Sequence, residues 1–76
     1  WATLYIGKGK KDKISKMDIV GFMFKKGGLA KDELGMVELK EFYSFVAIKA
    51  NRVNDVLRLV ADEKIKNMKT KIALAD

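Results

Sequence analysis

The side chains able to do chemistry in this 76-residue chain are lysines, aromatic rings and carboxylates, because it contains no cysteine and no histidine. Thiolate nucleophiles, histidine general bases and almost every zinc or copper site are thereby excluded. Adjacent carboxylates occur at Asp32/Glu33 and Asp62/Glu63, but no third ligand accompanies either pair. Neither pair predicts a metal or acid–base site, and we expect no catalytic residue in this chain.

Lysines dominate two short segments. The stretch LYIGKGKKDKI, at positions 4–14, places four lysines beside one acid, Asp12, and KIKNMK occupies positions 64–69. The formal net charge of +6 favours a polyanionic partner, nucleic acid before an acidic membrane surface, with ordinary solubilising charge as the alternative. The lysines expected to bind phosphate are Lys8, Lys10, Lys11, Lys13, Lys64, Lys66 and Lys69.

Alternating hydrophobicity predicts the strands that position these segments. Strands are expected over residues 3–7, 36–41, 42–48 and 70–75. The side chains expected to point into the core include Leu4, Ile6, Val37, Leu39, Ile72 and Leu74.

Two helices are predicted between the strands. Ser15, followed by Asp18 in a capping-box spacing, starts the first helix, and Gly27-Gly28 ends it. Asn51 is expected to cap the second, whose apolar face is Val53, Val56, Leu57 and Val60. The order β-α-β-β-α-β predicts one α+β domain over residues 1–76, a ferredoxin-like sandwich whose four-stranded antiparallel sheet carries both helices on one face.

Aromatic residues are expected on the uncovered sheet face. The first and third strands are central in such a fold, and alternation turns Tyr5, Tyr43 and Phe45 away from the core. Stacking a nucleic-acid base on such a ring contributes roughly 1–3 kcal/mol. The alternative is that these rings pack under a loop, a partner or a terminus such as Trp1.

The lysine loop, residues 8–13, leads from the first strand to the first helix, whose N-terminal N–H groups are natural phosphate donors. Residues 64–69 precede the strand expected beside the first, so the two basic segments are expected to form one electropositive band. Within the first helix, Gly21 costs about 1 kcal/mol relative to Ala. Close packing is the favoured explanation for this glycine, and a backbone approach by RNA is the other. Met17, Met23 and Met36 are expected to fill the core.

Two segments resemble the signatures of the RNA-recognition motif (RRM). LYIGKG is similar to its first-strand signature, and EFYSFVAI, residues 41–48, is similar to its third. Tyr43, Phe45 and Val46 match, whereas Glu41 stands for a basic residue, Phe42 for glycine and Ile48 for an aromatic.

The whole chain resembles the C-terminal RNA-binding domain of DEAD-box RNA helicases of the DbpA type. The resemblance is carried by GKKDKI (9–14), DIVGF (18–22), GGL (27–29), LGMVEL (34–39), YSFVAI (43–48) and KIKNMK (64–69). It implies an RRM-like domain, cut from a longer bacterial chain, that tethers an ATP-dependent helicase core to structured RNA, with large-subunit ribosomal RNA as the expected target during ribosome assembly. Lys8 and Asn67 depart from glycines common in that family.

Further expectations follow. The domain lacks a G-x-x-x-x-G-K-[ST] loop, so ATP and magnesium are assigned to the absent helicase core and no cofactor is expected here. The start at Trp1 is interpreted as a cut from a larger protein. We expect a cytoplasmic monomer with no membrane segment. A ferredoxin-like protein–protein interaction module is the main alternative, because the fold alone does not decide function.

Overall fold

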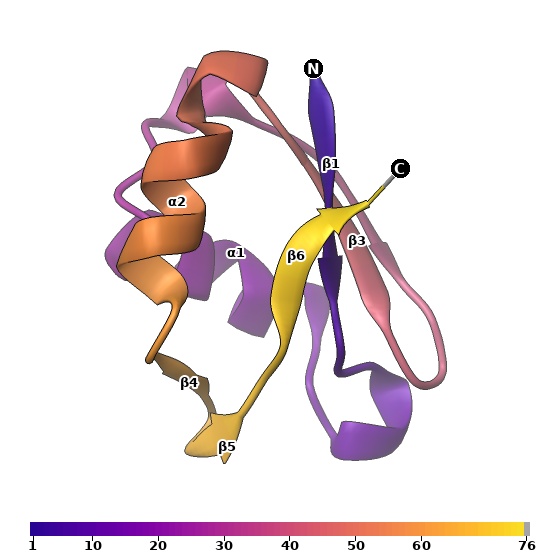
Figure 1. Cartoon of the computed structure of the whole chain (residues 1–76). Helices are drawn as coiled ribbons and strands as arrows, with labels where there is room; N and C mark the ends of the chain where they lie inside the picture. The colour runs from indigo at the N-terminus through magenta and orange to yellow at the C-terminus, as the bar shows by residue number, and fades with distance from the viewer. Residues whose placement is uncertain (76) are drawn as a thin grey trace.

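The computed structural model describes residues 1–75 and has the predicted α+β architecture (Figure 1). The elements are β1 (Ala2–Ile6), α1 (Lys16–Lys25), β2 (Leu34–Leu39), β3 (Ser44–Ile48), α2 (Val53–Val60), β4 (Lys64–Ile65), β5 (Met68–Lys69) and β6 (Ile72–Ala75). Single 3₁₀ turns cover Lys10–Asp12, Lys31–Glu33 and Ala50–Arg52. The main sheet has the order β2-β3-β1-β6 with antiparallel neighbours, so β1 and β3 are central, as predicted.

The core lies between this sheet and the two helices, which Figure 1 shows on the same side of it. Leu4, Ile6 and Val46 are completely buried on the sheet side, and Ile19 and Val56 on the helix side. The buried residues on β1 and β3 alternate with more exposed ones, which confirms that one sheet face is covered and the other open. This is the ferredoxin-like, RRM-type arrangement that the sequence predicts.

The predicted start of α1 is confirmed. The Asp18 backbone N–H donates to the Ser15 hydroxyl at 3.3 Å, and the Ser15 N–H donates to the Asp18 carboxylate at 2.8 Å, forming a capping box. At the other end, α1 stops before Gly27, and Gly28 takes a left-handed φ of 67°.

The cap predicted for α2 is wrong. Asn51 lies inside the 3₁₀ turn Ala50–Arg52, and α2 follows with Arg52 at the N-cap position and no side-chain cap. Because the turn runs directly into the helix, position 51 does not have the extended backbone that lets an Asn side chain reach the first helical N–H groups.

Several boundaries and burial predictions also differ. β2 begins two residues earlier than predicted, and the hairpin closes through the Lys40 N–H, which donates to Tyr43 O at 2.9 Å, so residues 40–43 form the connection. Leu74 pairs with Leu4 and so shares its sheet face, but it is 48% exposed on the edge strand. Met23 is buried as predicted, whereas Met17 and Met36 are exposed.

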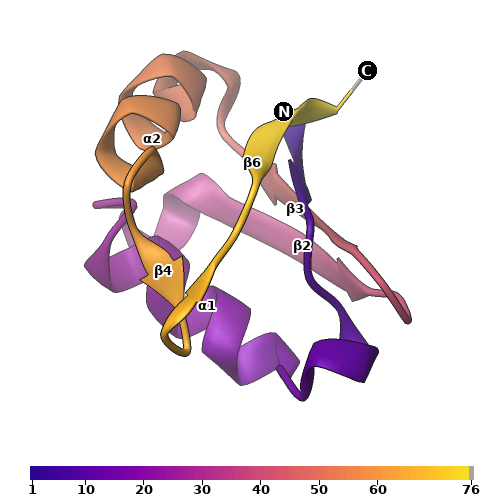
Figure 2. The ribbon, with the colours of Figure 1, turned by 60° about the horizontal axis from the view of Figure 1, so that its bottom comes forward.

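The segment KIKNMK forms a small hairpin that the predicted element order lacks. β4 and β5 pair antiparallel around Lys66 and Asn67, whose φ angles are 49° and 64°. Positive φ at both central residues is typical of a type I′ turn, which suits the twist of a two-residue hairpin. Figure 2 shows β4 beside α1, below the end of α2.

Candidate nucleic-acid interface

Three aromatic rings contact one another on the open sheet face. The ring centroids of Tyr5 and Tyr43 are 6.0 Å apart with planes 24° from parallel, and Phe45 lies 5.3 Å from Tyr43 and 6.2 Å from Tyr5 in edge arrangements. Tyr5 and Phe45 are paired in register, and their neighbours Leu4 and Val46 are buried on the other face. The placement predicted for these rings is confirmed, and we call the three residues the aromatic cluster.

Trp1 does not cover this cluster. Its ring packs against Gly35, where an added Cβ would lie 3.1 Å from it, and the Lys49 ammonium sits 4.4 Å above its centre. The aromatic cluster therefore stays accessible on its solvent side, as base stacking requires.

A hollow of about 370 Å³ adjoins Phe45 on the same face. Small side chains line it beside the ring, including Thr3 and Ala47, and Met36 and Glu38 from β2 border it. Glu38 was not predicted to belong to a site. Its outward direction nevertheless follows from the alternation of β2, because its neighbour Val37 points inward. A flat aromatic wall beside small residues leaves room for a planar group.

The lysine loop is held against the β2–β3 hairpin by its backbone. The N–H groups of Lys10 and Lys11 donate to the carbonyls of Lys40 and Glu41, both at 2.8 Å. Gly9 permits this approach, because a Cβ there would lie 2.4 Å from the Lys40 carbonyl oxygen. The loop is thus fixed at the hairpin end of the sheet while the side chains of Lys10, Lys11 and Lys13 remain exposed.

Two of the seven candidate lysines, Lys8 and Lys66, are paired with carboxylates of the domain itself, so they offer less net positive charge to a ligand. The Lys8 ammonium lies 3.9 Å from Asp12, and Lys66 Nζ donates to the Lys13 carbonyl at 2.9 Å and lies 3.5 Å from Asp18. Within residues 1–75, no carboxylate approaches within 4 Å of the other five, which are Lys10, Lys11, Lys13, Lys64 and Lys69.

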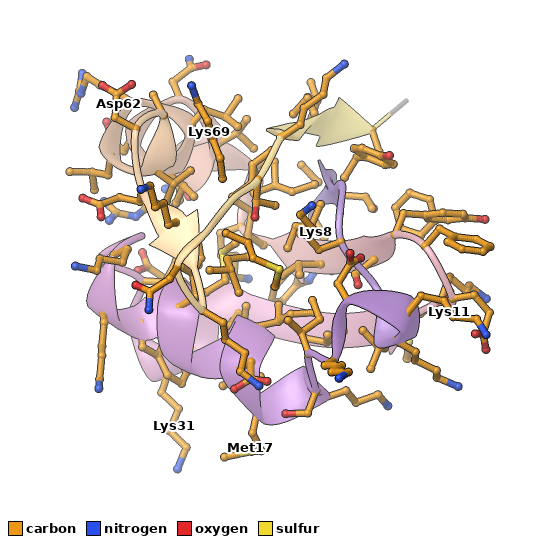
Figure 3. All side chains as sticks on the ribbon, turned by 90° about the horizontal axis from the view of Figure 1, so that it is seen from below. Lys8, Lys11, Met17, Lys31, Asp62 and Lys69 are labelled. Carbon is orange, nitrogen blue, oxygen red and sulfur yellow. The ribbon has the colours of Figure 1, made fainter. Side chains whose placement is uncertain are left out.

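The two basic segments, residues 8–13 and 64–69, meet at Lys66. Figure 3 shows Lys8 between Lys11, at one edge of the molecule, and Lys69. The contact between Lys66 and the Lys13 carbonyl joins the β4–β5 turn to the end of the lysine loop.

The N-terminus of α1 is already occupied by the protein's own carboxylate. The Ser15 N–H lowers the pKa of Asp18 by hydrogen bonding to its ionised carboxylate, and Lys66 lowers it further. With Ser15 and Asp18 satisfying each other, these two N–H groups are not free to bind phosphate as the sequence suggested.

Comparison with known proteins identifies the family. The model of the DbpA RNA binding domain matches residues 3–74. The curated ATP-dependent RNA helicase DbpA of Bacillus subtilis (strain 168) is 30% identical over 73 residues, which cover 96% of this chain and 15% of that helicase. The chain therefore belongs to the DbpA RNA-binding domain family and is an RNA-binding module.

Proposed function

We propose that this domain anchors an ATP-dependent RNA helicase, present in the same polypeptide, to structured RNA. The observation that carries the proposal is the aromatic cluster, three mutually contacting rings on the open sheet face of a basic domain of this family. The similar Bacillus subtilis protein is an RNA helicase of which this chain matches a short part, so unwinding, ATP and magnesium belong to the remainder of such a chain.

In this proposal, charge positions the RNA and the rings select unstacked bases. Lys10, Lys11 and Lys13 contact phosphates, which hold the RNA beside the hairpin end of the sheet without reading its sequence. A base leaving a loop or bulge then stacks on Phe45 or Tyr5, as single-stranded parts of folded RNA commonly do. The domain would therefore bind a structured RNA that has an accessible loop.

We also propose the specific target and setting of the domain. The target is large-subunit ribosomal RNA during ribosome assembly, and the domain acts as a monomer in the cytoplasm. These proposals rest on the resemblance to DbpA-type helicases and on the absence of cysteine, which suits a reducing compartment. Lys8 and Asn67, at positions where that family commonly has glycine, bear most directly on which RNA is chosen.

The test is a fluorescence-anisotropy titration of the domain with a large-subunit ribosomal RNA hairpin and with a scrambled strand, at 50 and 200 mM salt. The proposal predicts tighter binding to the hairpin. It also predicts a loss of affinity on the order of a few hundredfold across this salt range, if all five lysines without a carboxylate partner, Lys64 and Lys69 included, contact phosphates. Equal affinity for both RNAs would remove the ribosomal target and keep an RNA module.

Binding that is absent at low salt would contradict the RNA proposal. The exposed apolar side chains of Met36 and Phe42 would then favour docking of a protein partner on the sheet.

A further inference from the structure

A basic depression lies on the helix side of the domain, away from the aromatic cluster. It has a volume of about 320 Å³ and runs between α1 and the β4–β5 hairpin. Its lining includes Gly21, Lys25, Lys26, Lys64 and Lys66. We call it the lysine groove; Figure 2 shows its two walls, α1 and β4, side by side.

Gly21, which lines the groove from α1, is a helical glycine that packing does not explain. A Cβ added at Gly21 would meet nothing within 4 Å, so alanine would fit without displacing any neighbour. Glycine is nevertheless less favourable than alanine inside a helix. The close packing that the sequence suggested for Gly21 is therefore wrong, and its bare backbone faces open space.

The walls of the groove are strongly positive. Four lysines and one aspartate, Asp18, line it, which gives a formal charge of +3. Glu63 pairs with Lys26 at 3.6 Å and Asp18 with Lys66 at 3.5 Å. Within the described part of the chain, Lys25 and Lys64 have no carboxylate within 4 Å, so one uncompensated lysine stands on each wall.

From these observations we infer that the lysine groove is a second RNA site, which takes the phosphodiester backbone across Gly21 between Lys25 and Lys64. This inference rests on the proposed RNA-binding function and extends it from one face of the domain to two. The missing side chain at Gly21 lets the backbone approach the helix, and the two lysines bind its phosphates as point charges.

The length of the RNA decides whether it contacts one site or both, because the two sites lie on different sides of the domain. The aromatic cluster lies on the uncovered side of the sheet, and α1 lies on the covered side. Lys66 lines the groove and also contacts the Lys13 carbonyl, so the lysine loop lies on the way from one site to the other. A tetranucleotide is expected to occupy the sheet alone, whereas a folded RNA contacts both sites.

The first test compares Gly21→Glu with Asn54→Glu, which introduces the same charge at an exposed position of α2. Gly21→Glu is expected to weaken binding of the ribosomal RNA hairpin roughly tenfold at 50 mM salt, and Asn54→Glu far less. Neither should change the affinity for a tetranucleotide. Gly21→Ala serves as the folding control and is expected to raise the Tm, because alanine favours the helix.

A second test removes two lysine charges from the groove and leaves Gly21 unchanged. Lys25→Gln combined with Lys64→Gln should reduce the slope of log affinity against log salt for the hairpin by about two, whereas Lys31→Gln, on an exposed lysine outside the groove, should leave it unchanged.

The inference is overturned if Gly21→Glu and the double lysine variant bind the hairpin like their controls while Phe45→Leu weakens binding; the proposed function then stands. If the wild-type domain binds no RNA, the proposed function and the inference fail together. If the tetranucleotide responds to Gly21→Glu as strongly as the hairpin, the separation into two sites is wrong.

Discussion

The aromatic cluster and the lysine loop lie at neighbouring places on the domain but are positioned by different physics. Tyr5 and Phe45 face solvent because their strand neighbours Leu4 and Val46 are fully buried, so the core itself sets their direction. The loop is set by backbone hydrogen bonds to the β2–β3 hairpin and by the missing side chain of Gly9. Substitutions near the rings should therefore leave the ring positions unchanged. A substitution at Gly9, where the loop backbone approaches the hairpin, should displace the loop.

The largest effect is expected from Gly9→Ala, because it disturbs both the fold and the loop. The new Cβ would lie 2.4 Å from the Lys40 carbonyl oxygen and 2.6 Å from the Tyr43 nitrogen, so the backbone must move. Overpacking of this kind costs about 1–3 kcal/mol, which lowers the Tm of a domain this small by roughly 5–20 °C.

Thermal denaturation followed by circular dichroism measures this effect, and Gly7→Ala is its control. At Gly7 an added Cβ meets Lys71 at an ordinary 3.5 Å. If both variants melt at the wild-type temperature, the close contact does not hold the loop.

The next largest effect is expected from Phe45→Leu, which removes a ring and keeps an apolar strand residue. Loss of base stacking should weaken RNA binding by about 1–3 kcal/mol while leaving its salt dependence unchanged, because no phosphate contact is lost. Anisotropy titration measures both quantities. Phe24→Leu, at an exposed position of α1, makes the same substitution away from the sheet face and should bind like the wild type.

A smaller effect on the salt dependence of RNA binding is expected from single lysine substitutions, and it should be larger for a lysine without a carboxylate partner than for one with such a partner. Lys11→Gln should lower the salt slope of RNA binding by about one. Lys8→Gln should change the slope less, because Lys8 lies 3.9 Å from Asp12 and presents less net charge. Equal slopes for the two variants would mean that the pairing with Asp12 does not persist beside RNA.

The smallest effect concerns pH and the start of α1. The pKa of Asp18 is lowered in the folded protein, chiefly by the hydrogen bond from the Ser15 N–H. Its contribution to stability is therefore fully present above the usual pKa of 3.8 and is lost as the pH falls through the lower folded value. Tm values of wild type and Asp18→Asn should differ at neutral pH and converge in acid. A difference in Tm that does not shrink as the pH is lowered would assign the effect to something other than ionisation.

The sequence predicted what periodicity controls. The faces of β1 and β3 follow from alternating apolar residues, the central place of these strands from the β-α-β-β-α-β element order, and the capping box of α1 from the Ser15–Asp18 spacing, and all are confirmed. The sequence did not predict the partners of long side chains. Lys66 contacts Lys13 and Asp18 because the β4–β5 turn places it beside them, and that hairpin was not predicted. The sequence also did not show that an added side chain would meet a crowded backbone at Gly9 and open space at Gly21.

The most direct test of the central claim is the salt dependence of hairpin RNA binding for three proteins: wild type, Phe45→Leu, and Lys10→Gln combined with Lys11→Gln. We expect a steep wild-type slope of roughly −3.5 to −4.5, from five phosphate contacts. The ring variant should keep that slope at lower affinity, and the lysine variant should lose about two from it. A wild-type slope near zero, or equal slopes for the wild type and the lysine variant, would contradict RNA binding through these lysines and rings.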